Sequence, residues 1–267
     1  MQFHPVILES HNSPQAKLWI YTNYHCNLSC PYCLAKSTPT AAPRLIPIED
    51  IYRIIHEAQS LGFDHLFFTG GEPFLREDIY QILAHSAEHL PTTVLTNAML
   101  LSGKRLKKLI EVQKTNLFLQ VSLDGASAEQ HDAYRGRGSW NKTMAGIKAL
   151  LAAGFQVSIS TTETPANCDK IQEICSLHQA LGIPEDRHII RTLAKRGFSN
   201  EGIEVNHHNL PPEITITHEG AFWHPMTTEE DMLLRKEIFP LAELIRLVQE
   251  KNLQFEDSPV FTANSFT

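Results

Sequence analysis

Three of the five cysteines in this 267-residue chain, Cys26, Cys30 and Cys33, stand at spacings of four and three. Thiol groups so close together are typical of a metal site. A structural zinc site needs a fourth cysteine or histidine, and His25 is badly placed because it directly precedes Cys26. The alternative is a 4Fe–4S cluster held by three thiolates, whose fourth iron stays open for another ligand. The spacing alone leaves both kinds of site open.

The composition limits the classes of protein to which the chain can belong. A net charge of −7 and a pI near 6.0 argue against a general nucleic-acid or anionic-membrane binder. No apolar run approaches the roughly 18 residues that span a bilayer, and the N-terminus lacks the features of a secretory signal. We therefore expect no membrane partner, a cytoplasmic location, and cysteines that act as ligands rather than in disulfides. The most basic run, residues 104–108, is interpreted as a solvated helix face.

The elements around the cysteines follow from an alternation of β-rich runs with longer runs of helical periodicity. The predicted strands, of which the second runs into a turn, cover residues 18–22, 65–73, 92–98, 117–125, 156–163 and 187–197. The predicted helices cover residues 47–62, 77–88, 102–113, 139–154 and 168–182. Six such steps predict an α/β fold, a partial (β/α)6 TIM-like barrel. An open doubly wound sheet is the alternative architecture.

Polar residues follow every predicted strand. The cysteines come after the first strand, and residues 69–73 end the second. Because the carboxyl ends of parallel strands meet at one rim, we expect these side chains to form a single site. The later strands are followed by Asn97, Asp124, residues 161–163, and Lys195 with Arg196.

The alternation stops after residue 200. Residues 213–217 and 221–225 predict a hairpin, and residues 232–251 predict a helix that is interrupted at Pro240. We therefore expect a barrel core over residues 1–200 and a C-terminal extension of hairpin and helix over residues 201–267. The last sixteen residues show no clear pattern and are interpreted as a tail.

The cysteine run resembles a known signature once a second motif is considered. Cys26, Cys30 and Cys33, with Tyr32 before the last cysteine, match the pattern of the radical S-adenosylmethionine (SAM) superfamily. The run TGGEP at residues 69–73, at the end of the next strand, resembles the second landmark of that superfamily. The two motifs together are far more specific than the cysteines alone.

Two further motifs are similar to one subgroup of that superfamily. They are SLDG at residues 122–125 and HDAYRG at residues 131–136. The subgroup includes molybdenum-cofactor cyclases, anaerobic sulfatase-maturating enzymes and peptide-modifying enzymes. The resemblance covers about residues 17–200 and implies the six-step barrel of the family.

The resemblance implies one 4Fe–4S cluster held by Cys26, Cys30 and Cys33, with SAM bound at the open iron. An external one-electron donor of flavodoxin or ferredoxin type would reduce the cluster. SAM would then yield a 5′-deoxyadenosyl radical, which would take a hydrogen atom from a peptide or a small biosynthetic intermediate. An iron–sulfur electron carrier or sensor without SAM chemistry is the main alternative, and a structural zinc protein is another.

The resemblance also implies a set of SAM-binding residues. Glu72, beside Gly70 and Gly71, would accept protons of the methionine amine, and Arg135 would pair with the methionine carboxylate. The other implied contacts of SAM or of the turn are Tyr32, Pro73, Asn97, Ser122, Asp124 and Leu193. Structural roles are the alternatives: a tight turn at the glycines, a cap at Asp124, a surface ion pair at Arg135, a left-handed turn at Asn97, and packing at Tyr32.

The C-terminal part departs from many relatives, which carry a cysteine-rich extension with auxiliary clusters. No cysteine follows Cys175, so we expect no auxiliary cluster. Residues 214–225 resemble the hairpin that opens such extensions, and His224 stands near the first expected cysteine. His224 is a candidate substrate contact or proton relay. The histidines of this loop-rich region are interpreted as solvent-facing, and the alternative is a metal site formed by His207, His208, His218 and His224.

Two more residues are candidates for contact with the substrate. Cys168, just past the fifth strand, is a candidate hydrogen-atom donor, with a buried cysteine at a helix start as the alternative. Lys195, with Arg196 beside it, is a candidate for binding a substrate carboxylate or phosphate, with an exposed loop as the alternative. The seventeen residues before the first strand are expected to be too few for a separate leader-peptide recognition domain.

Overall fold

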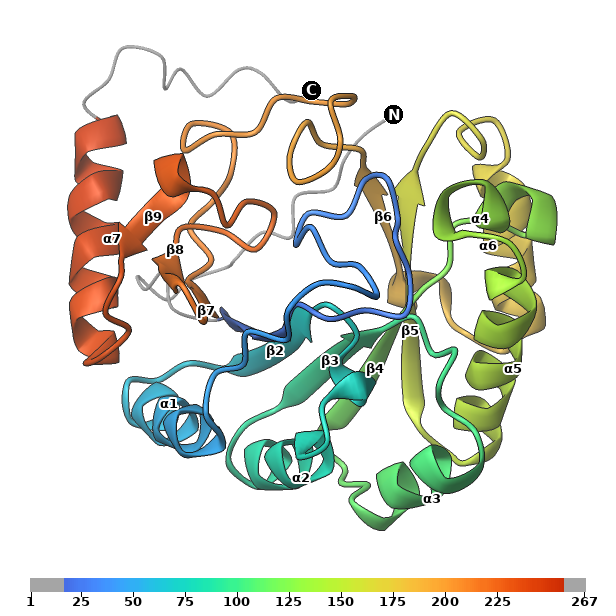
Figure 1. Cartoon of the computed structure of the whole chain (residues 1–267), viewed down its shortest axis with the longest axis horizontal. Helices are drawn as coiled ribbons and strands as arrows, with labels where there is room; N and C mark the ends of the chain where they lie inside the picture. Colours follow the sequence, from blue (N-terminus) through green and yellow to red (C-terminus); the bar gives the residue numbers. More distant parts are fainter. Residues whose placement is uncertain (1–16, 257–267) are drawn as a thin grey trace.

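The computed structural model describes residues 17–256 and shows a curved sheet of nine strands with helices on its outer side (Figure 1). The six parallel strands are β1 (Lys17–Asn23), β2 (His65–Gly70), β3 (Thr92–Thr96), β4 (Leu117–Ser122), β5 (Gln156–Glu163) and β6 (His188–Thr192). The helices between them are α1 (Ile48–Ser60), α2 (Ile79–His89), α3 (Gly103–Glu111), α4 (Ala128–Arg135), α5 (Ser139–Ala152) and α6 (Ile171–Ala180). The predicted partial (β/α)6 barrel is thus confirmed.

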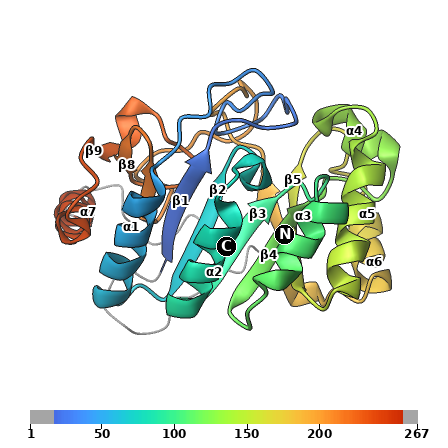
Figure 2. The same ribbon diagram turned by 60° about the horizontal axis from the view of Figure 1, so that its bottom comes forward.

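The barrel does not close. The strand order is β6-β5-β4-β3-β2-β1-β7-β8-β9, so β6 lies at one edge of the sheet. The short strands β7 (Thr215–Thr217), β8 (Gly220–Phe222) and β9 (Leu233–Arg235) extend the sheet beyond β1. The carboxyl ends of the parallel strands share one rim, and the long loop between β1 and α1 crosses above it (Figure 2).

Strand β1 shows how the two faces of the sheet differ. Leu18 and Ile20 are fully buried in the hydrophobic core that the sheet shares with the outer helices. Trp19 and Tyr21 point to the opposite face, because side chains alternate along a strand, and they line a cavity. Burial on both faces explains why the run LWIYT is continuously apolar rather than alternating.

Helix α1 illustrates the packing of the outer layer. Ile51, Ile54, Ile55 and Ala58 are buried at helical spacing and form one apolar stripe that faces the sheet. Each fully buried isoleucine contributes roughly 1.5–3 kcal/mol of hydrophobic free energy. This layer holds the strands, and therefore the rim, in place.

The C-terminal region contains the predicted hairpin and helix, with different boundaries. The prediction of a helix from residue 232 is wrong for its first part, because Leu233 lies in β9 and pairs with Phe222 of β8. Helix α7 (Leu241–Glu256) begins only after Pro240, since proline lacks an N–H and disfavours a helical residue before it. The expected tail over the last sixteen residues is therefore helical up to residue 256, and its remainder lies outside the described residues.

The domain boundary at residue 200 stays a prediction. The buried hydrophobic core continues across it, because Ile216, Trp223 and Leu244 belong to the same cluster as Ile20 and Ile55. Strand β7 also pairs in parallel with β1. The C-terminal strands therefore add to the sheet of the barrel.

Two further boundaries differ from the predictions, and one helix was not predicted. Strand β6 ends at Thr192 instead of residue 197, because the chain turns there to pack on the loop between β1 and α1, where Phe198 N donates to Cys33 O. Helix α6 begins at Ile171, since Asn167 before it holds a turn by donating to the carbonyls of Asp124 and Thr162. Helix α4 was not predicted from the HDAYRG motif.

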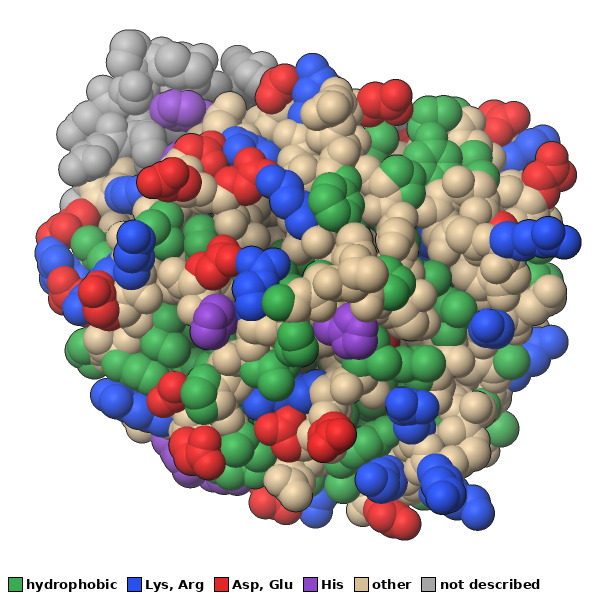
Figure 3. Space-filling view, in the orientation of Figure 1, with side chains coloured by type: hydrophobic (Ala, Val, Ile, Leu, Met, Phe, Trp, Pro, Cys, Tyr) green, Lys and Arg blue, Asp and Glu red, His purple; other side chains and the backbone are tan. Residues whose placement is uncertain are grey.

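The surface agrees with the interpretation of the basic run. Lys104, Arg105, Lys107 and Lys108 of α3 are exposed, whereas Leu109 is buried. Basic side chains gather at the lower right of Figure 3, where α3 lies, and acidic side chains are scattered over the rest of that face. Among the described residues 17–256, no helix is both long and apolar enough to cross a membrane.

Candidate active site

A cavity lies at the rim of the barrel, and every one of the six parallel strands contributes to its wall. The loop between β1 and α1, called the cysteine loop here (residues 24–47), covers it from above (Figure 2). Predicted site residues that line it are Cys26, Cys30, Tyr32, Cys33, Gly70, Gly71, Glu72, Asn97, Ser122, Arg135 and Leu193. The rim therefore forms a single site, as the strand ends predict.

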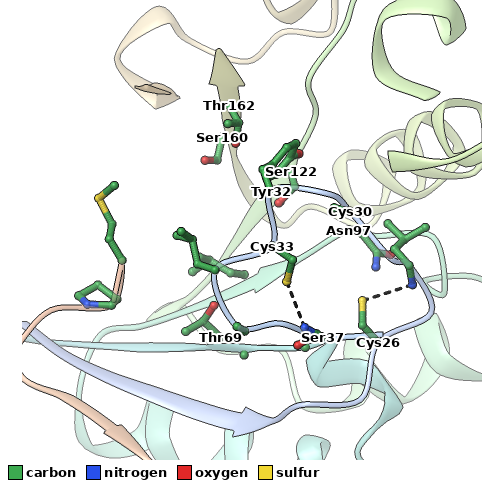
Figure 4. A pocket seen from close by; sticks show the side chains of 18 of the residues that line it. Cys26, Cys30, Tyr32, Cys33, Ser37, Thr69, Asn97, Ser122, Ser160 and Thr162 are labelled. Atoms are coloured by element: carbon green, nitrogen blue, oxygen red, sulfur yellow. Dashed lines mark hydrogen bonds between the residues drawn. The ribbon is translucent and has the colours of Figure 1, made fainter. Parts of the chain in front are cut away.

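The three clustered cysteines lie in the cysteine loop as free thiols. The sulfurs of Cys26 and Cys33 lie within the space that this loop encloses (Figure 4). Each accepts a backbone hydrogen bond at 3.4 Å, Cys26 from Leu28 N and Cys33 from Ser37 N. Burial raises the pKa of Cys26 to about 12 and that of Cys30 to about 11, so these thiols keep their protons unless a metal replaces them.

The GGEP turn after β2 is fastened to the start of the cysteine loop. Gly71 N donates to Asn23 O at 2.7 Å, and Glu72 N donates to His25 O at 2.9 Å. A Cβ atom on Gly70 would come within 2.3 Å of Asn23 O, and one on Gly71 within 2.2 Å of His25 O. The glycines are therefore required for the close approach of two backbone segments, which fixes the cysteines relative to β2.

Glu72 is a buried carboxylate at the floor of the cavity, with an exposed fraction of 1%. Its Oε1 accepts from Thr96 Oγ1 at 2.8 Å and Phe74 N at 3.1 Å, and its Oε2 accepts from Asn97 N at 2.9 Å. These donors favour the ionised form, but burial outweighs them and raises the pKa of Glu72 to about 7. A cation in the cavity would favour the ionised carboxylate.

Asp124, Tyr32 and Arg135 form a hydrogen-bonded polar group at the wall of the cavity. Arg135 Nε donates to Asp124 Oδ2 at 2.6 Å, and the Tyr32 hydroxyl donates to the same oxygen. Thr162 N donates to Asp124 Oδ1 at 2.9 Å. Burial lowers the pKa of Arg135, but Asp124, Tyr32 and Cys30 together more than offset this, so the pKa of Arg135 is raised well above its usual value. Tyr32 and Arg135 line the cavity, whereas Asp124 holds them from outside it.

Asn97 links β3 to the cysteine loop. Its Nδ2 donates to Asn27 Oδ1 at 2.9 Å, and its Oδ1 accepts from Met99 N at 3.0 Å. The residue with the left-handed backbone at this turn is Ala98, with a φ of 58°. Ser122 of β4 lies in register with Ser160 of β5, and both hydroxyl-bearing side chains line the cavity (Figure 4).

Several predicted residues lie outside the cavity wall. Pro73 is buried at the start of a short 3-10 helix (Pro73–Leu75). Cys168 is exposed, so the alternative of a buried cysteine is wrong, and it does not line the cavity where a hydrogen-atom donor is expected. Lys195 is exposed and pairs with Glu204 at 3.0 Å. Arg196 is held by acidic partners, including Asp231 at 2.7 Å.

The histidines of the C-terminal region differ in their surroundings. His208 and His218 are exposed as expected, whereas His207 is half-buried and packs against Trp223 with ring centroids 5.0 Å apart. His224 is buried and accepts a hydrogen bond from Met226 N, and burial lowers its pKa to about 4. A neutral His224 therefore shapes the turn at the cavity entrance.

Several cavity residues were not predicted as site residues, and five of them come together from distant parts of the chain. We call Trp19, Tyr21, Arg191, Pro225 and Met226 the Arg191 set. Tyr21 and Arg191 are at inward positions of β1 and β6, and the Tyr21 hydroxyl donates to Pro225 O at 2.7 Å. The one signal in the sequence was Arg191, a charged residue inside the predicted strand 187–197, whereas the predicted site residues follow the strands. A second group of cavity residues comes from the predicted motifs. We call it the cysteine set, and it consists of Cys26, Cys30, Cys33, Gly70, Gly71, Glu72 and Asn97.

Comparisons with known proteins agree on one family. The radical SAM superfamily model matches residues 20–174, more than half of the chain. The AdoMet-dependent heme synthase of Methanosarcina barkeri is 34% identical over 175 residues, which are 64% of this chain and 49% of that protein. Mycofactocin maturase MftC of Mycolicibacterium smegmatis is 31% identical over 173 residues, 64% of this chain and 43% of that protein.

A solved structure shares the fold. SuiB of Streptococcus suis, bound to the precursor peptide SuiA, matches 90% of this chain and 46% of its own with a TM-score of 0.60. The sequence identity is 19%, so this likeness concerns the fold alone. The chain spans about half the length, or less, of the curated relatives it matches.

The chain belongs to the radical SAM superfamily, as its cysteine and GGEP motifs predict. The matched relatives, a heme synthase and a maturase, are enzymes. Membership in this family implies a 4Fe–4S cluster and SAM.

Proposed function

We propose that this protein is an enzyme that cleaves SAM at a 4Fe–4S cluster and removes a hydrogen atom from a peptide or a small biosynthetic intermediate. The observation that carries the proposal is one cavity in which three free thiols lie beside the GGEP turn and a ring of six strand ends. An electron carrier needs the thiols but has no use for a lined cavity of this depth.

The cysteine loop fits a three-thiolate cluster. The thiols of Cys26 and Cys30 are desolvated, and the sulfurs of Cys26 and Cys33 accept amide hydrogen bonds, a feature that tunes the potential of iron–sulfur centres. Among residues 17–256 the other two cysteines, Cys168 and Cys175, do not line the cavity, so a fourth thiolate is not at hand. Cys26, Cys30 and Cys33 would therefore hold the cluster and leave one iron open.

The cluster and SAM, when bound, supply the one-electron cleavage of SAM and the removal of a substrate hydrogen atom. The residues around them bind and orient. Glu72 would accept hydrogen bonds from the methionine amine, whose positive charge offsets the cost of keeping this buried carboxylate ionised. Arg135, held at Nε by Asp124, would turn its remaining N–H groups to the methionine carboxylate.

Three other residues would complete the SAM site. Tyr32 lines the cavity with its hydroxyl fixed by Asp124, so its ring is held in place to flank the adenine. Ser122 has a cavity-facing hydroxyl for the ribose, and Leu193 contributes the backbone beside the adenine.

The substrate class is supported by the relatives. One curated relative is a maturase, and SuiB, which shares the fold, was solved with a precursor peptide. Another relative is a heme synthase, so a small biosynthetic intermediate is the second candidate. We propose that a flavodoxin- or ferredoxin-type protein supplies the electron, in keeping with a cytoplasmic enzyme.

Anaerobic reconstitution with iron and sulfide tests this function. We expect about four irons per chain, visible absorbance of an iron–sulfur cluster, and 5′-deoxyadenosine from SAM and dithionite. Cys30→Ala should lose the cluster and this product, whereas Cys175→Ala, which alters a thiol outside the cavity, should keep both. A cluster that never cleaves SAM would support the electron carrier, and stoichiometric zinc without iron would support the zinc protein.

A further inference from the structure

We propose that Arg191 binds a carboxylate of the substrate, and that the substrate has an apolar or aromatic group next to this carboxylate. The proposal rests on the proposed function, because it assigns the substrate of the same cavity. It concerns the Arg191 set, which the motifs of the family do not include.

Arg191 is a cation without a partner in a largely desolvated position. It is half-buried on β6, at the position paired with Thr162 of β5, and it lines the cavity. Its guanidinium group makes no hydrogen bond or ion pair with any residue from 17 to 256, unlike those of Arg135 and Arg196. Burial lowers the pKa of Arg191, as expected for a guanidinium that has lost water without gaining a counter-ion.

Glu213 is the acidic side chain whose charge acts on Arg191, and both of its carboxylate oxygens already accept hydrogen bonds from other residues. Its Oε1 accepts from Lys17 Nζ at 3.1 Å and its Oε2 from Trp19 Nε1 at 2.6 Å. Tyr21, also close enough to feel the charge of Arg191, uses its hydroxyl to donate to Pro225 O. A bound anion is therefore the missing partner of Arg191.

The surroundings favour a carboxylate over a phosphate. A phosphate dianion usually needs several donors or cations, and no other Lys or Arg of the described chain lines the cavity except Arg135, which Asp124 holds. A single guanidinium matches a carboxylate, which it can bind through two parallel hydrogen bonds.

The rest of the Arg191 set is apolar toward the cavity. Trp19 stacks on Phe67 with ring centroids 4.3 Å apart, and its indole N–H is taken by Glu213. The hydroxyl of Tyr21 donates to Pro225 O, so Tyr21 contributes mainly its ring to the cavity wall. Pro225 and Met226 add further apolar surface to this wall. An apolar or aromatic group beside the carboxylate would bury against this wall.

Binding of small probes to the cluster-loaded protein tests the proposal without any turnover. The probes are 3-phenylpropionate and the peptide N-acetyl-alanyl-phenylalanine, each compared with its own amide by isothermal titration. We expect the wild type to bind each carboxylate about tenfold more tightly than the amide. Arg191→Gln should abolish this difference, Arg191→Lys should keep part of it, and Lys195→Gln, which removes a cation outside the cavity, should keep all of it.

The outcomes separate this proposal from the proposed function. Tighter binding of the peptide than of 3-phenylpropionate indicates a peptide C-terminus as the source of the carboxylate, and the reverse indicates a small molecule. Equal binding by wild type and Arg191→Gln, no carboxylate binding, or preference for phenyl phosphate overturns the proposal. A parallel loss of SAM affinity in Arg191→Gln also overturns it, because Arg191 would then hold the cofactor. None of these results depends on SAM cleavage.

A second, independent observation concerns the outer helices. The side chains of His56 on α1 and of His85 and His89 on α2 bring a ring nitrogen each within 4.8 Å of one another. Histidine side chains gather at the lower left edge of Figure 3, where α1 and α2 lie. His85 and His89 are four residues apart, so they share one face of their helix.

The geometry points to a divalent-metal site with zinc as the best candidate. His89 Nδ1 donates to His85 O at 2.8 Å, which leaves Nε2 of His89 free to bind a metal. His85 Nε2 is buried and has no hydrogen-bond partner in the described chain. Three imidazoles with water as a fourth ligand are a common arrangement for zinc.

Zinc titration of the cluster-loaded protein tests this site, because the cluster occupies the cysteines of the cavity. We expect one equivalent of zinc to bind with submicromolar Kd. His56→Gln, His85→Gln and His89→Gln should each weaken binding at least tenfold, and His218→Gln, which alters an exposed histidine elsewhere, should not. Binding that survives all three changes, or that is absent in the wild type, overturns the assignment.

Discussion

The two sets of residues that line the cavity are held in different ways. The cysteine set comes from neighbouring loops joined by backbone hydrogen bonds, with glycines that allow contacts closer than a side chain permits. The Arg191 set comes from β1, β6 and the turn after β8, and its arginine lacks a partner among residues 17–256. The cysteine set is held by contacts within the protein, whereas the Arg191 set contains a charge that has no partner in the described chain.

This difference matches the roles that we propose: the cysteine set binds the cluster and SAM, and the Arg191 set binds the substrate. A site for one constant cofactor gains from preorganisation, since every donor and acceptor is in place before binding. A site for a particular substrate is defined by the charge that it leaves unpaired. Changes in the cysteine set should therefore affect cluster and SAM, and changes in the Arg191 set should affect substrate.

The largest effect is expected from Gly71→Ala. The new Cβ would overlap His25 O and push the cysteine loop away from β2. We expect reconstituted protein with less than a tenth of the wild-type iron and no measurable 5′-deoxyadenosine. Gly62→Ala is the control for backbone strain without a steric clash, because Gly62 has a φ of +81° and nothing lies within 4 Å of its Cβ. Full iron content in Gly71→Ala would show that the glycine contact does not hold the loop.

Asp124→Asn should have the next largest effect. It removes the charge that pairs with buried Arg135 and weakens the hold on Tyr32. Breaking one partner of a buried ion pair costs about 3–5 kcal/mol, so urea unfolding should show a decrease of this size. Asp169→Asn, an exposed aspartate, should leave the free energy of unfolding unchanged. An equal stability of Asp124→Asn and wild type would contradict a structural role for the pair.

Much of the cysteine set could be predicted from sequence, because its members are contiguous motifs at strand ends. The alternation of strands and helices likewise predicted the barrel. Arg191 could not be found in this way, because its role depends on which face of β6 it occupies and on the absence of a partner. Pro225 and Met226 reach the cavity only because β7 pairs with β1, a long-range contact that no local pattern encodes.

Glu72→Gln should weaken SAM binding about tenfold to a hundredfold, the size expected for hydrogen bonds to a charged group. Since burial raises the pKa of Glu72 to about 7, wild-type SAM affinity should rise between pH 6 and pH 8 as the carboxylate ionises. Equilibrium dialysis of cluster-loaded protein measures both effects. Glu88→Gln, which alters an exposed glutamate, should bind SAM as the wild type does. If the SAM affinity of Glu72→Gln still rises with pH, Glu72 is not the cause of the rise.

The same carboxylate should make a contribution to stability that changes with pH in the opposite direction. A folded-state pKa of about 7, above the usual value of 4.5, means that the folded protein holds an extra proton between these pH values. The contribution of Glu72 to the free energy of unfolding should therefore decrease as pH rises from 4.5 to 7. Urea unfolding of the wild type and of Glu72→Gln at pH 5 and pH 8 measures the contribution of Glu72 to the free energy of unfolding. A contribution that increases with pH would contradict the burial of this carboxylate.

Met226→Ala should have the smallest effect. Met226 is half-buried at the entrance, so losing its side chain should reduce the affinity for 3-phenylpropionate about fivefold, in line with about 1 kcal/mol of apolar contact. Titration against the matched amide, as for Arg191, measures the change. A loss of iron in Met226→Ala would contradict the separation of the two sets.

The central claim is that Cys26, Cys30 and Cys33 hold a cluster whose open iron binds SAM. Electron paramagnetic resonance of the reconstituted, dithionite-reduced protein, recorded before and after SAM is added, tests this claim most directly. We expect a 4Fe–4S signal whose g values shift when SAM is added to the wild type and to Cys175→Ala. We expect no such signal in Cys30→Ala. A signal that saturating SAM leaves unchanged, or one that survives in Cys30→Ala, would contradict it.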